Sequence, residues 1–289
     1  MVSVTDATAA IEPTAVPRWE RFVAVGDSFS EGLWDPYPSA PDDVVRAAGT
    51  DEAVQRGWAD RLADALSVRR TAAGLDPLEY ANLAIRGRLL HQIVGEQVPV
   101  ALEAKPDLIS LVGGGNDILR PGVDVDDISQ TLEDAVVRIR ATGADVLLGA
   151  GFKAGGALSF TRGRTGTFNS NVWSIAQQHG AYVLDLWGMR SLFDLRLWAE
   201  DRLHLTPEGH RRVMNAALFA LRLVPDDADY DQPLPPAPLL PLKEKAKAEA
   251  EWAREYVVPW VKRRLTHTSS GDGRDPKWPQ PLRWPESRR

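Results

Sequence analysis

The sequence predicts an α/β fold in which a parallel sheet is covered by helices on both faces. From Arg21 to about Val224, short and almost continuous apolar runs alternate with longer amphipathic stretches. Such apolar runs are typical of strands buried on both faces, and the longer stretches are typical of the helices that connect parallel strands. Hydrophobic residues make up 44% of the 289 residues, a globular composition that excludes disorder or coiled coil as a description of the whole chain.

The strands and helices can be placed in order along the chain. Strands are expected at Arg21–Val25, Leu78–Asn82, Asp107–Val112, Asp145–Ala150 and Ala181–Leu186. Helices are expected at about Val54–Val68, Arg88–Glu103, Val125–Thr142, Thr165–His179 and Pro207–Leu223. Helix boundary signals support the pattern, because Gly143 and Gly180 follow two of these helices and Thr206 before Pro207 is a typical helix start.

Four regions follow from this pattern and from composition. Residues 1–20 form a lead segment, residues 21–224 the α/β domain, and residues 225–241 a proline-rich, semi-rigid linker. Residues 242–289 form a C-terminal extension, which is predicted to be helical over Lys243–Tyr256 and irregular near its end. Four of the ten tryptophans lie in the extension, so we expect it to pack on the domain.

Charge and composition limit the partners. The extension has 12 Lys and Arg against 7 Asp and Glu, which leaves 22 basic and 33 acidic residues in the first 241. An acidic body disfavours binding to nucleic acid, although the basic run Lys262–Arg264 leaves an acidic membrane surface or nucleic acid as an alternative partner for the extension. No apolar run approaches the roughly 20 residues that span a bilayer, so stable membrane insertion is not expected.

The sequence contains no cysteine and no recognisable secretory signal, and both features bear on where the protein is expected to act. Without cysteine, disulfides and thiolate metal sites are excluded. The first residues show neither a basic stretch nor an apolar stretch of the secretory kind, and a cytoplasmic location is therefore expected. These features leave the oligomeric state open.

Ser28 is the first candidate for chemistry. It follows the first predicted strand within the segment 23–32 (VAVGDSFSEG), at the end of a strand where open α/β sheets bind ligands. A serine hydroxyl is a poor nucleophile until a positioned base removes its proton. The sequence must therefore also supply a base.

His204 is the best of five histidines for that role. Asp201 precedes it by three residues, close enough in a tight turn to hold the imidazole tautomer. His210 falls within the following predicted helix, where local packing is the simpler explanation, and His179 suits the end of a helix.

Acyl transfer also requires donors where negative charge develops on the carbonyl oxygen. The segment Asn82–Gly87 leaves the second strand and offers the backbone N–H of Gly87. The segment Gly113–Asp117 leaves the third strand, where the glycines permit a sharp turn that presents the Asn116 amide.

These four segments together resemble the GDSL family, also called SGNH hydrolases, which is named for the Ser, Gly, Asn and His of four sequence blocks. The matching residues are Gly26-Asp27-Ser28, with Phe29 in place of the usual leucine, then Gly87, then Gly114-Gly115-Asn116-Asp117, and last Asp201 with His204. Each block is weak alone, but four in order and at suitable spacing are specific. The resemblance covers about Arg21 to Leu223.

The resemblance implies a flavodoxin-like three-layer α/β/α sandwich and hydrolysis of carboxylic esters or thioesters through an acyl-enzyme. Ser28, His204 and Asp201 would form the triad. The oxyanion hole would consist of the Ser28 and Gly87 N–H groups and the Asn116 side chain. A small-molecule ester is then the expected substrate, and no cofactor or metal is implied.

Other readings explain less. A non-catalytic relative that binds an acylated ligand is the main alternative. A metal hydrolase built from Asp27, Asp117, Asp201, His204 and His210 is disfavoured, because no H-E-x-x-H occurs and a histidine pair six residues apart on a loop and a helix is poor ligand geometry. The phosphate-binding P-loop and the G-x-S-x-G elbow of α/β-hydrolases are both absent around Ser28.

The substrate is the least determined feature. Trp34 and Tyr37 lie in a proline-rich segment after Ser28, where they could offer rings to an acyl chain or a sugar. Packing of these rings under a surface loop is an equal alternative. Short-chain esters, lipids, thioesters and acetylated sugars all remain open.

Overall fold

A computed structural model describes residues 15–37, 54–237, 250–257 and 269–284. Its centre is a six-stranded sheet with the order β5-β4-β3-β1-β2-β6. The strands are β1 (Arg21–Gly26), β2 (Glu79–Asn82), β3 (Leu108–Val112), β4 (Asp145–Ala150), β5 (Tyr182–Asp185) and β6 (Trp278–Arg283). Strands β1 to β5 are parallel, and their order is that of flavodoxin-like folds. The predicted α/β class with a parallel central sheet is confirmed.

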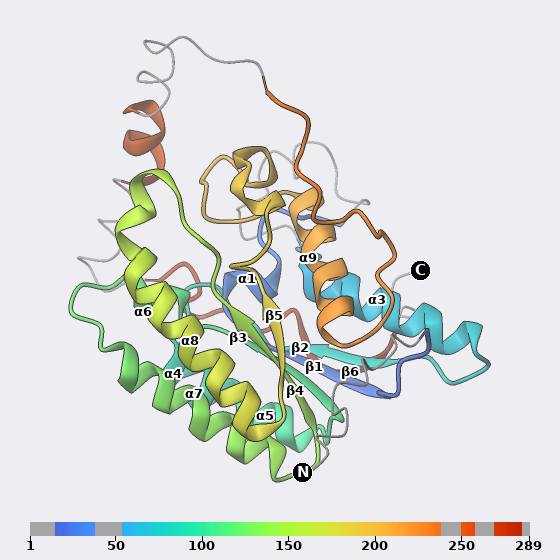
Figure 1. The fold of residues 1–289 in the computed structure, drawn as a ribbon. Helices are drawn as coiled ribbons and strands as arrows, with labels where there is room; N and C mark the ends of the chain where they lie inside the picture. Colours follow the sequence, from blue (N-terminus) through green and yellow to red (C-terminus); the bar gives the residue numbers. More distant parts are fainter. Residues whose placement is uncertain (1–14, 38–53, 238–249, 258–268, 285–289) are drawn as a thin grey trace, which may run out of the picture.

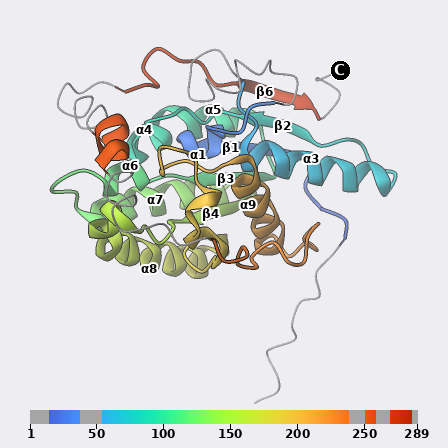
Figure 2. The same ribbon diagram turned by 90° about the horizontal axis from the view of Figure 1, so that it is seen from above.

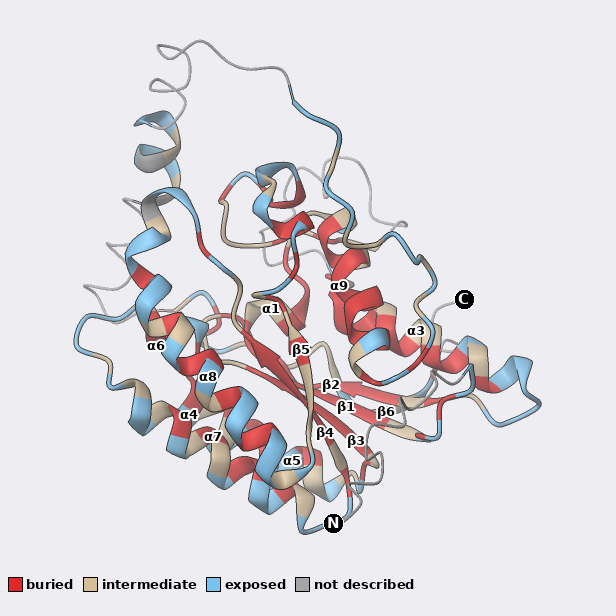
Figure 3. Ribbon diagram, in the orientation of Figure 1, coloured by how far each residue is buried: buried red, intermediate tan, exposed pale blue. Residues whose placement is uncertain are grey.

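Helices cover both faces of the sheet (Figure 1). One face carries α3 (Gly57–Ala72) and α9 (Pro207–Ala220), and the other carries α4 (Leu90–Gln92), α5 (Val98–Glu103), α7 (Val125–Arg140) and α8 (Arg162–His179). Each layer has its own apolar cluster against the strands (Figure 3). Strands β1 to β4 are almost wholly buried, whereas β5 is half-buried and β6 is partly exposed. Burial on both faces explains why the strands read as continuous apolar runs rather than alternating ones.

Local signals set several helix boundaries. The Thr206 hydroxyl accepts a hydrogen bond from the Gly209 N–H and caps α9, with Pro207 at its first position. Gly180 ends α8 with a left-handed backbone (φ 65°), which glycine adopts without steric cost. The helix expected from Val54 begins instead at Gly57 and extends to Ala72.

The stretch Arg88–Glu103 is not the single helix that its pattern predicts. A π-helical segment, η1 (Ile93–Gln97), separates α4 from α5. The wider turn places the Gln97 amide against the backbone of Gly26, where it accepts from the N–H at 2.8 Å and donates to the carbonyl at 2.9 Å. This contact outside the helix satisfies polar groups at the end of β1.

The C-terminal extension adds the last strand of the sheet (Figure 2). Strand β6 pairs antiparallel with β2, with Tyr80 opposite Leu282, so the expectation of irregular structure is wrong at residues 278–283. Trp284 is fully buried and stacks edge-on against Tyr80. Of the predicted helix Lys243–Tyr256, only residues from 250 onward are described, and they include η5 (Ala253–Val257); Trp260 lies outside the described residues.

Several short helices lie in the segments that follow the strands. They are α1 (Ser28–Glu31), α6 (Gly115–Ile118), η2 (Gly156–Thr161), η3 (Ser191–Phe193) and η4 (Leu195–Leu197). Linker residues 225–237 contain no helix or strand and pack along α9, where Arg212 donates to the carbonyls of Tyr230 and Gln232. In the described part of the chain, every helix is too short or too polar to cross a bilayer.

Candidate active site

The turn that carries Ser28 joins β1 to α1 at the switch point of the sheet, between the carboxyl ends of β1 and β3. The Asp27 carboxylate caps α1 by accepting a hydrogen bond from the Phe29 N–H at 3.0 Å. Gly26 passes so close to β3 that a Cβ there would lie 2.5 Å from the Val112 carbonyl oxygen. Glycine is required at this position because the two backbones are in contact.

Ser28, His204 and Asp201 form one continuous hydrogen-bonded chain. The Ser28 Oγ lies 2.8 Å from Nε2 of His204, and Nδ1 of His204 lies 2.6 Å from Oδ2 of Asp201. The second carboxylate oxygen of Asp201 accepts from the backbone N–H groups of Leu203 and His204 at 2.9 and 3.0 Å. This carboxylate is therefore fixed in its turn, and the imidazole is fixed by the carboxylate.

Electrostatics in the site favour a charge separation between His204 and Asp201. Burial works to lower the pKa of His204, but the Asp201 carboxylate outweighs it and the pKa lies above its ordinary value. Burial works to raise the pKa of Asp201, but the nearby His204 and the backbone N–H groups hold it below its ordinary value. An imidazolium that forms here is thus stabilised by a carboxylate that stays ionised.

Asn116 lies at the start of α6, directly after β3, and faces the Ser28 turn. Its Nδ2 donates to the second oxygen of Asp27 at 3.1 Å and to the Arg88 carbonyl at 3.2 Å. Burial raises the pKa of Asp27 to about 6. The amide is thus held beside Ser28 by the residue that also caps α1.

Gly87 lies in a neighbouring turn after β2, with φ 76°. The preceding residue, Arg86, is held by Glu31 at the end of α1, whose carboxylate accepts from both the Arg86 backbone N–H and its guanidinium. Ser269 of the extension packs so closely on Gly87 that a Cβ would collide with its hydroxyl. The structure therefore connects the Gly87 turn to the Ser28 helix through a buried ion pair that has no signature in the sequence.

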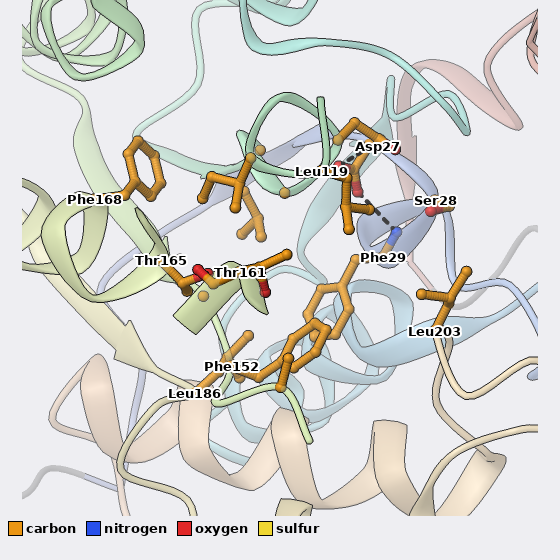
Figure 4. Close-up of a pocket in the computed structure, with 18 of the residues that line it drawn as sticks. Asp27, Ser28, Phe29, Leu119, Phe152, Thr161, Thr165, Phe168, Leu186 and Leu203 are labelled. Carbon is orange, nitrogen blue, oxygen red and sulfur yellow. Dashed lines mark hydrogen bonds between the residues drawn. The ribbon is translucent and has the colours of Figure 1, made fainter. Parts of the chain in front are cut away.

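A pocket opens beside Ser28 and His204 (Figure 4). Its cavity volume is about 150 Å³. The lining is mainly apolar and includes Phe29, Leu119, Phe152, Phe168, Leu186 and Leu203. The Thr161 and Thr165 hydroxyls also line it, and each donates to a backbone carbonyl one helical turn earlier. Asn116 lines the same pocket, whereas Gly87 is not among its lining residues.

The role of Trp34 and Tyr37 as substrate contacts stays a prediction. Neither lines the pocket, and each has a partner within the protein. The indole N–H of Trp34 donates to Asp201 at 3.0 Å, and the Tyr37 hydroxyl donates to the buried carboxylate of Asp60. Tyr37 is thus joined to α3 through Asp60, and Trp34 extends the hydrogen-bonded chain at Ser28.

His210 lies apart from the site. Its Nδ1 accepts from the Trp58 N–H at 3.2 Å, and its Nε2 donates to the Leu33 carbonyl at 3.1 Å. Burial lowers the pKa of His210 to about 4, so the ring is neutral at physiological pH. Within the described residues, no group of three or more His, Asp or Glu side chains is arranged to hold a metal ion.

The extension also reaches the turn that carries Asp201 and His204. The Arg202 guanidinium lies 4.7 Å from the ring centroid of Trp252, and the Tyr256 hydroxyl donates to Glu200 at 3.0 Å. These contacts lie on either side of Asp201. Two separate parts of the extension therefore border the site, one at Glu200–Arg202 and one at Gly87.

Solved structures with the same fold include an acetyl xylan esterase and an alpha/beta hydrolase. An acetyl xylan esterase from Geobacillus stearothermophilus, Axe2, aligns with 72% of this chain and 97% of its own at a TM-score of 0.58 and 19% identity. LAE5, an alpha/beta hydrolase from the metagenome of Lake Arreo, aligns with 72% of this chain and 96% of its own, at a TM-score of 0.56 and 21% identity. TesA aligns with 70% of this chain and 97% of its own, at a TM-score of 0.52 and 23% identity. At these identities the likeness establishes the fold.

The family assignment rests on the sequence itself. No curated protein matches the whole sequence significantly. Residues 24–212 match the model of the GDSL-like lipase/acylhydrolase family. That span holds Ser28, Gly87, Asn116, Asp201 and His204, the positions from which the resemblance was first argued. The chain therefore belongs to the GDSL-like lipase/acylhydrolase family and is a hydrolase of the serine esterase and lipase type.

Proposed function

We propose that the protein hydrolyses carboxylic esters of apolar acyl groups through an acyl-enzyme on Ser28. The observation that carries the proposal is the hydrogen-bonded chain from Ser28 through His204 to Asp201 at the mouth of an apolar pocket. A neutral His204 would accept the hydroxyl proton on Nε2 while Oγ attacks the ester carbonyl carbon. His204 would then return this proton to the departing alcohol.

The second half of the reaction uses the same groups. Water would lose a proton to His204 and attack the acyl carbon, and His204 would return the proton to Ser28 as the carboxylic acid leaves. Negative charge on the carbonyl oxygen would be stabilised by the Ser28 N–H, the Gly87 N–H and the Asn116 amide. Support for Asn116 is its place in the pocket wall, and support for Gly87 is the ion pair that joins its turn to α1. A thioester would react by the same steps with a thiol as the leaving group.

The pocket favours an acyl chain over a sugar as the group beside Ser28. Ring and aliphatic side chains surround the cavity, and the two threonine hydroxyls in its wall already donate to the backbone. A sugar requires several convergent polar partners, which a lining of this kind does not offer. Acetylated carbohydrate, the substrate class named for Axe2, is therefore the second choice.

A fluorophosphonate probe and the Ser28→Ala variant test the proposal together. The wild type should be labelled and should hydrolyse p-nitrophenyl esters. Ser28→Ala should fold normally, resist labelling and lose activity by a factor on the order of 10³ or more. Normal turnover by a folded Ser28→Ala variant would remove Ser28 from the mechanism, and an unlabelled wild type would favour a non-catalytic protein that binds an acylated ligand.

A further inference from the structure

Lys277, in the C-terminal extension, is buried beneath the helix that carries Ser28. Its side chain is 9% exposed. The ammonium group donates to three backbone carbonyls, those of Glu31 at 2.6 Å, Gln55 at 2.7 Å and Arg56 at 2.9 Å. It also lies 3.1 Å from the Asp60 carboxylate, whose side chain is fully buried. A cation this completely enclosed is costly unless it is paired, so its position is tightly defined.

The three carbonyls belong to two elements that meet at the site. Glu31 is the last residue of α1, while Gln55 and Arg56 directly precede α3. The last carbonyls of a helix have no partner within it, and a lysine is well suited to bind them. At the same junction, Gly32 and Gly57 are in backbone contact, and a Cβ on Gly32 would lie 2.5 Å from the Gly57 Cα. Lys277 thus joins the end of α1 to the start of α3.

Asp60 connects this junction to the sheet. Its carboxylate accepts hydrogen bonds from the Tyr80 hydroxyl at 2.8 Å and the Asn82 amide at 3.2 Å, both on β2. It also accepts from the Trp278 indole at 3.1 Å. Removal of Lys277 would take away a cation that lies 3.1 Å from this buried carboxylate.

The extension reaches the other half of the site through Glu31. The Lys277 ammonium binds the Glu31 backbone, and the Glu31 side chain binds Arg86, which precedes Gly87. A few residues earlier in the extension, Ser269 packs on Gly87 and the backbone of Gly271 packs on the Arg86 carbonyl. Figure 2 shows this last stretch of the chain running past α1 on its way to β6.

We infer that Lys277 is a positioning residue for the hydrolytic site. It holds the Ser28 helix, and through Glu31 the Gly87 turn, in the positions that the reaction requires. The inference rests on the proposed function, because it assigns Lys277 a part in the reactivity of Ser28. Lys277 contacts none of the reacting atoms and acts by way of α1. A displacement of about 1 Å at a reacting group lowers the rate by a factor on the order of 10².

The test compares Lys277→Met with the double variant Lys277→Met/Asp60→Asn. Methionine keeps the length of the stem and removes the donors, while the second change removes the carboxylate that faces the lost cation. Both variants should lower kcat by a factor on the order of 10 to 100 with KM little changed, and should slow fluorophosphonate labelling in parallel. The double variant should melt at a higher temperature than Lys277→Met, because it no longer holds a buried carboxylate that has lost this cation. Activity is measured well below the melting temperature of each variant.

Arg283→Met, at the end of the strand that follows Lys277, is the matched control. Its ion pair with Asp76 lies on the exposed side of β6, away from α1, so kcat and labelling should stay at the wild-type level. Wild-type kcat and labelling in the folded double variant would overturn the inference and reduce Lys277 to a stabilising residue. An unlabelled and inactive wild type would overturn the proposed function, and the inference with it.

Discussion

Trp34 donates its indole N–H to the same Asp201 oxygen that His204 contacts, at 3.0 Å, and so extends the hydrogen-bonded chain by one residue. The Asp201 carboxylate is buried and is surrounded by donors from the ring of His204, from Trp34 and from two backbone N–H groups. The Trp34 backbone is left-handed, with φ 70°, which is uncommon for a bulky residue and clusters at functional sites. This geometry leads to the first prediction.

Trp34→Phe should lower kcat by about tenfold, because the indole N–H helps to fix the Asp201 carboxylate that orients His204, while other donors to Asp201 remain. Without the indole N–H, the carboxylate interacts more strongly with the imidazolium, so the pKa of His204 should rise and the acid limb should move to higher pH. Steady-state kinetics across pH measure both effects. Trp173→Phe, at a half-exposed position on α8, is the control, and an unchanged limb in Trp34→Phe would exclude this role.

Activity should rise with pH, because only neutral His204 can accept the Ser28 proton. The pKa of His204 is raised, so the midpoint should lie above the ordinary value of about 6.5. The Asp27 carboxylate, whose own pKa is about 6, contributes to the raised pKa of His204. Asp27→Asn should therefore keep the rise of activity with pH but move its midpoint to lower pH. The profile of kcat/KM measures this, and a flat profile from pH 5 to 9 in a stable protein would argue against His204 as the base.

Asp201→Asn should lower kcat by a factor on the order of 10⁴ with little change in fold, since an amide stabilises the wrong imidazole tautomer. The Ser28 hydroxyl would then face a ring nitrogen that already carries a proton. Turnover and circular dichroism of the same preparation measure the two effects. A small loss of kcat in a folded variant would mean that Asp201 does not orient His204.

The pocket should discriminate by acyl length. Each methylene that enters it should raise kcat/KM about fourfold, from about 0.8 kcal/mol of transfer free energy, until the cavity is full. Ala154 lines the pocket, and Ala154→Leu should lower the chain length at which this gain stops while acetate hydrolysis changes little. A series of p-nitrophenyl esters measures the profile. A preference for acetate in the wild type would instead favour the acetylated-sugar alternative.

His210 should make the fold sensitive to acid. The pKa is about 4 in the folded state, while the unfolded chain has the ordinary value of about 6.5, so the unfolded state binds the proton first. The free energy of unfolding should therefore fall as pH drops from 6.5 towards 4, by up to about 1.4 kcal/mol per pH unit from this group. Urea unfolding at several pH values measures the slope. His210→Gln should make it shallower, and an identical slope would contradict the assignment.

Much of the fold could be predicted because its signals are local. The apolar runs from Arg21, Asp107 and Asp145 each correspond to a strand that is buried on both faces. The pairing of Asp201 with His204 was visible because it spans one turn. Ser28 and His204, which are 176 residues apart, were matched by comparing the five histidines and then by the order of the family's sequence blocks.

What could not be predicted depends on contacts between distant segments. Glu31 with Arg86, Trp34 with Asp201, and Lys277 with Asp60 leave no periodic trace in the sequence. Strand β6 was hidden by its own composition, since Pro279 and Pro281 lack an N–H and argue against a central strand. They are tolerated because β6 is an edge strand, where one side of the backbone makes no pairing.

The same two prolines have a consequence for how copies of the chain meet. The outer edge of a sheet is a template on which another strand can pair, and proteins protect such edges with proline and charge. Strand β6 covers the backbone of β2 and ends the sheet with Pro279, Pro281 and Arg283. A chain that lost these residues would present β2 as a bare hydrogen-bonding edge, and edge-to-edge aggregation of such a chain is expected.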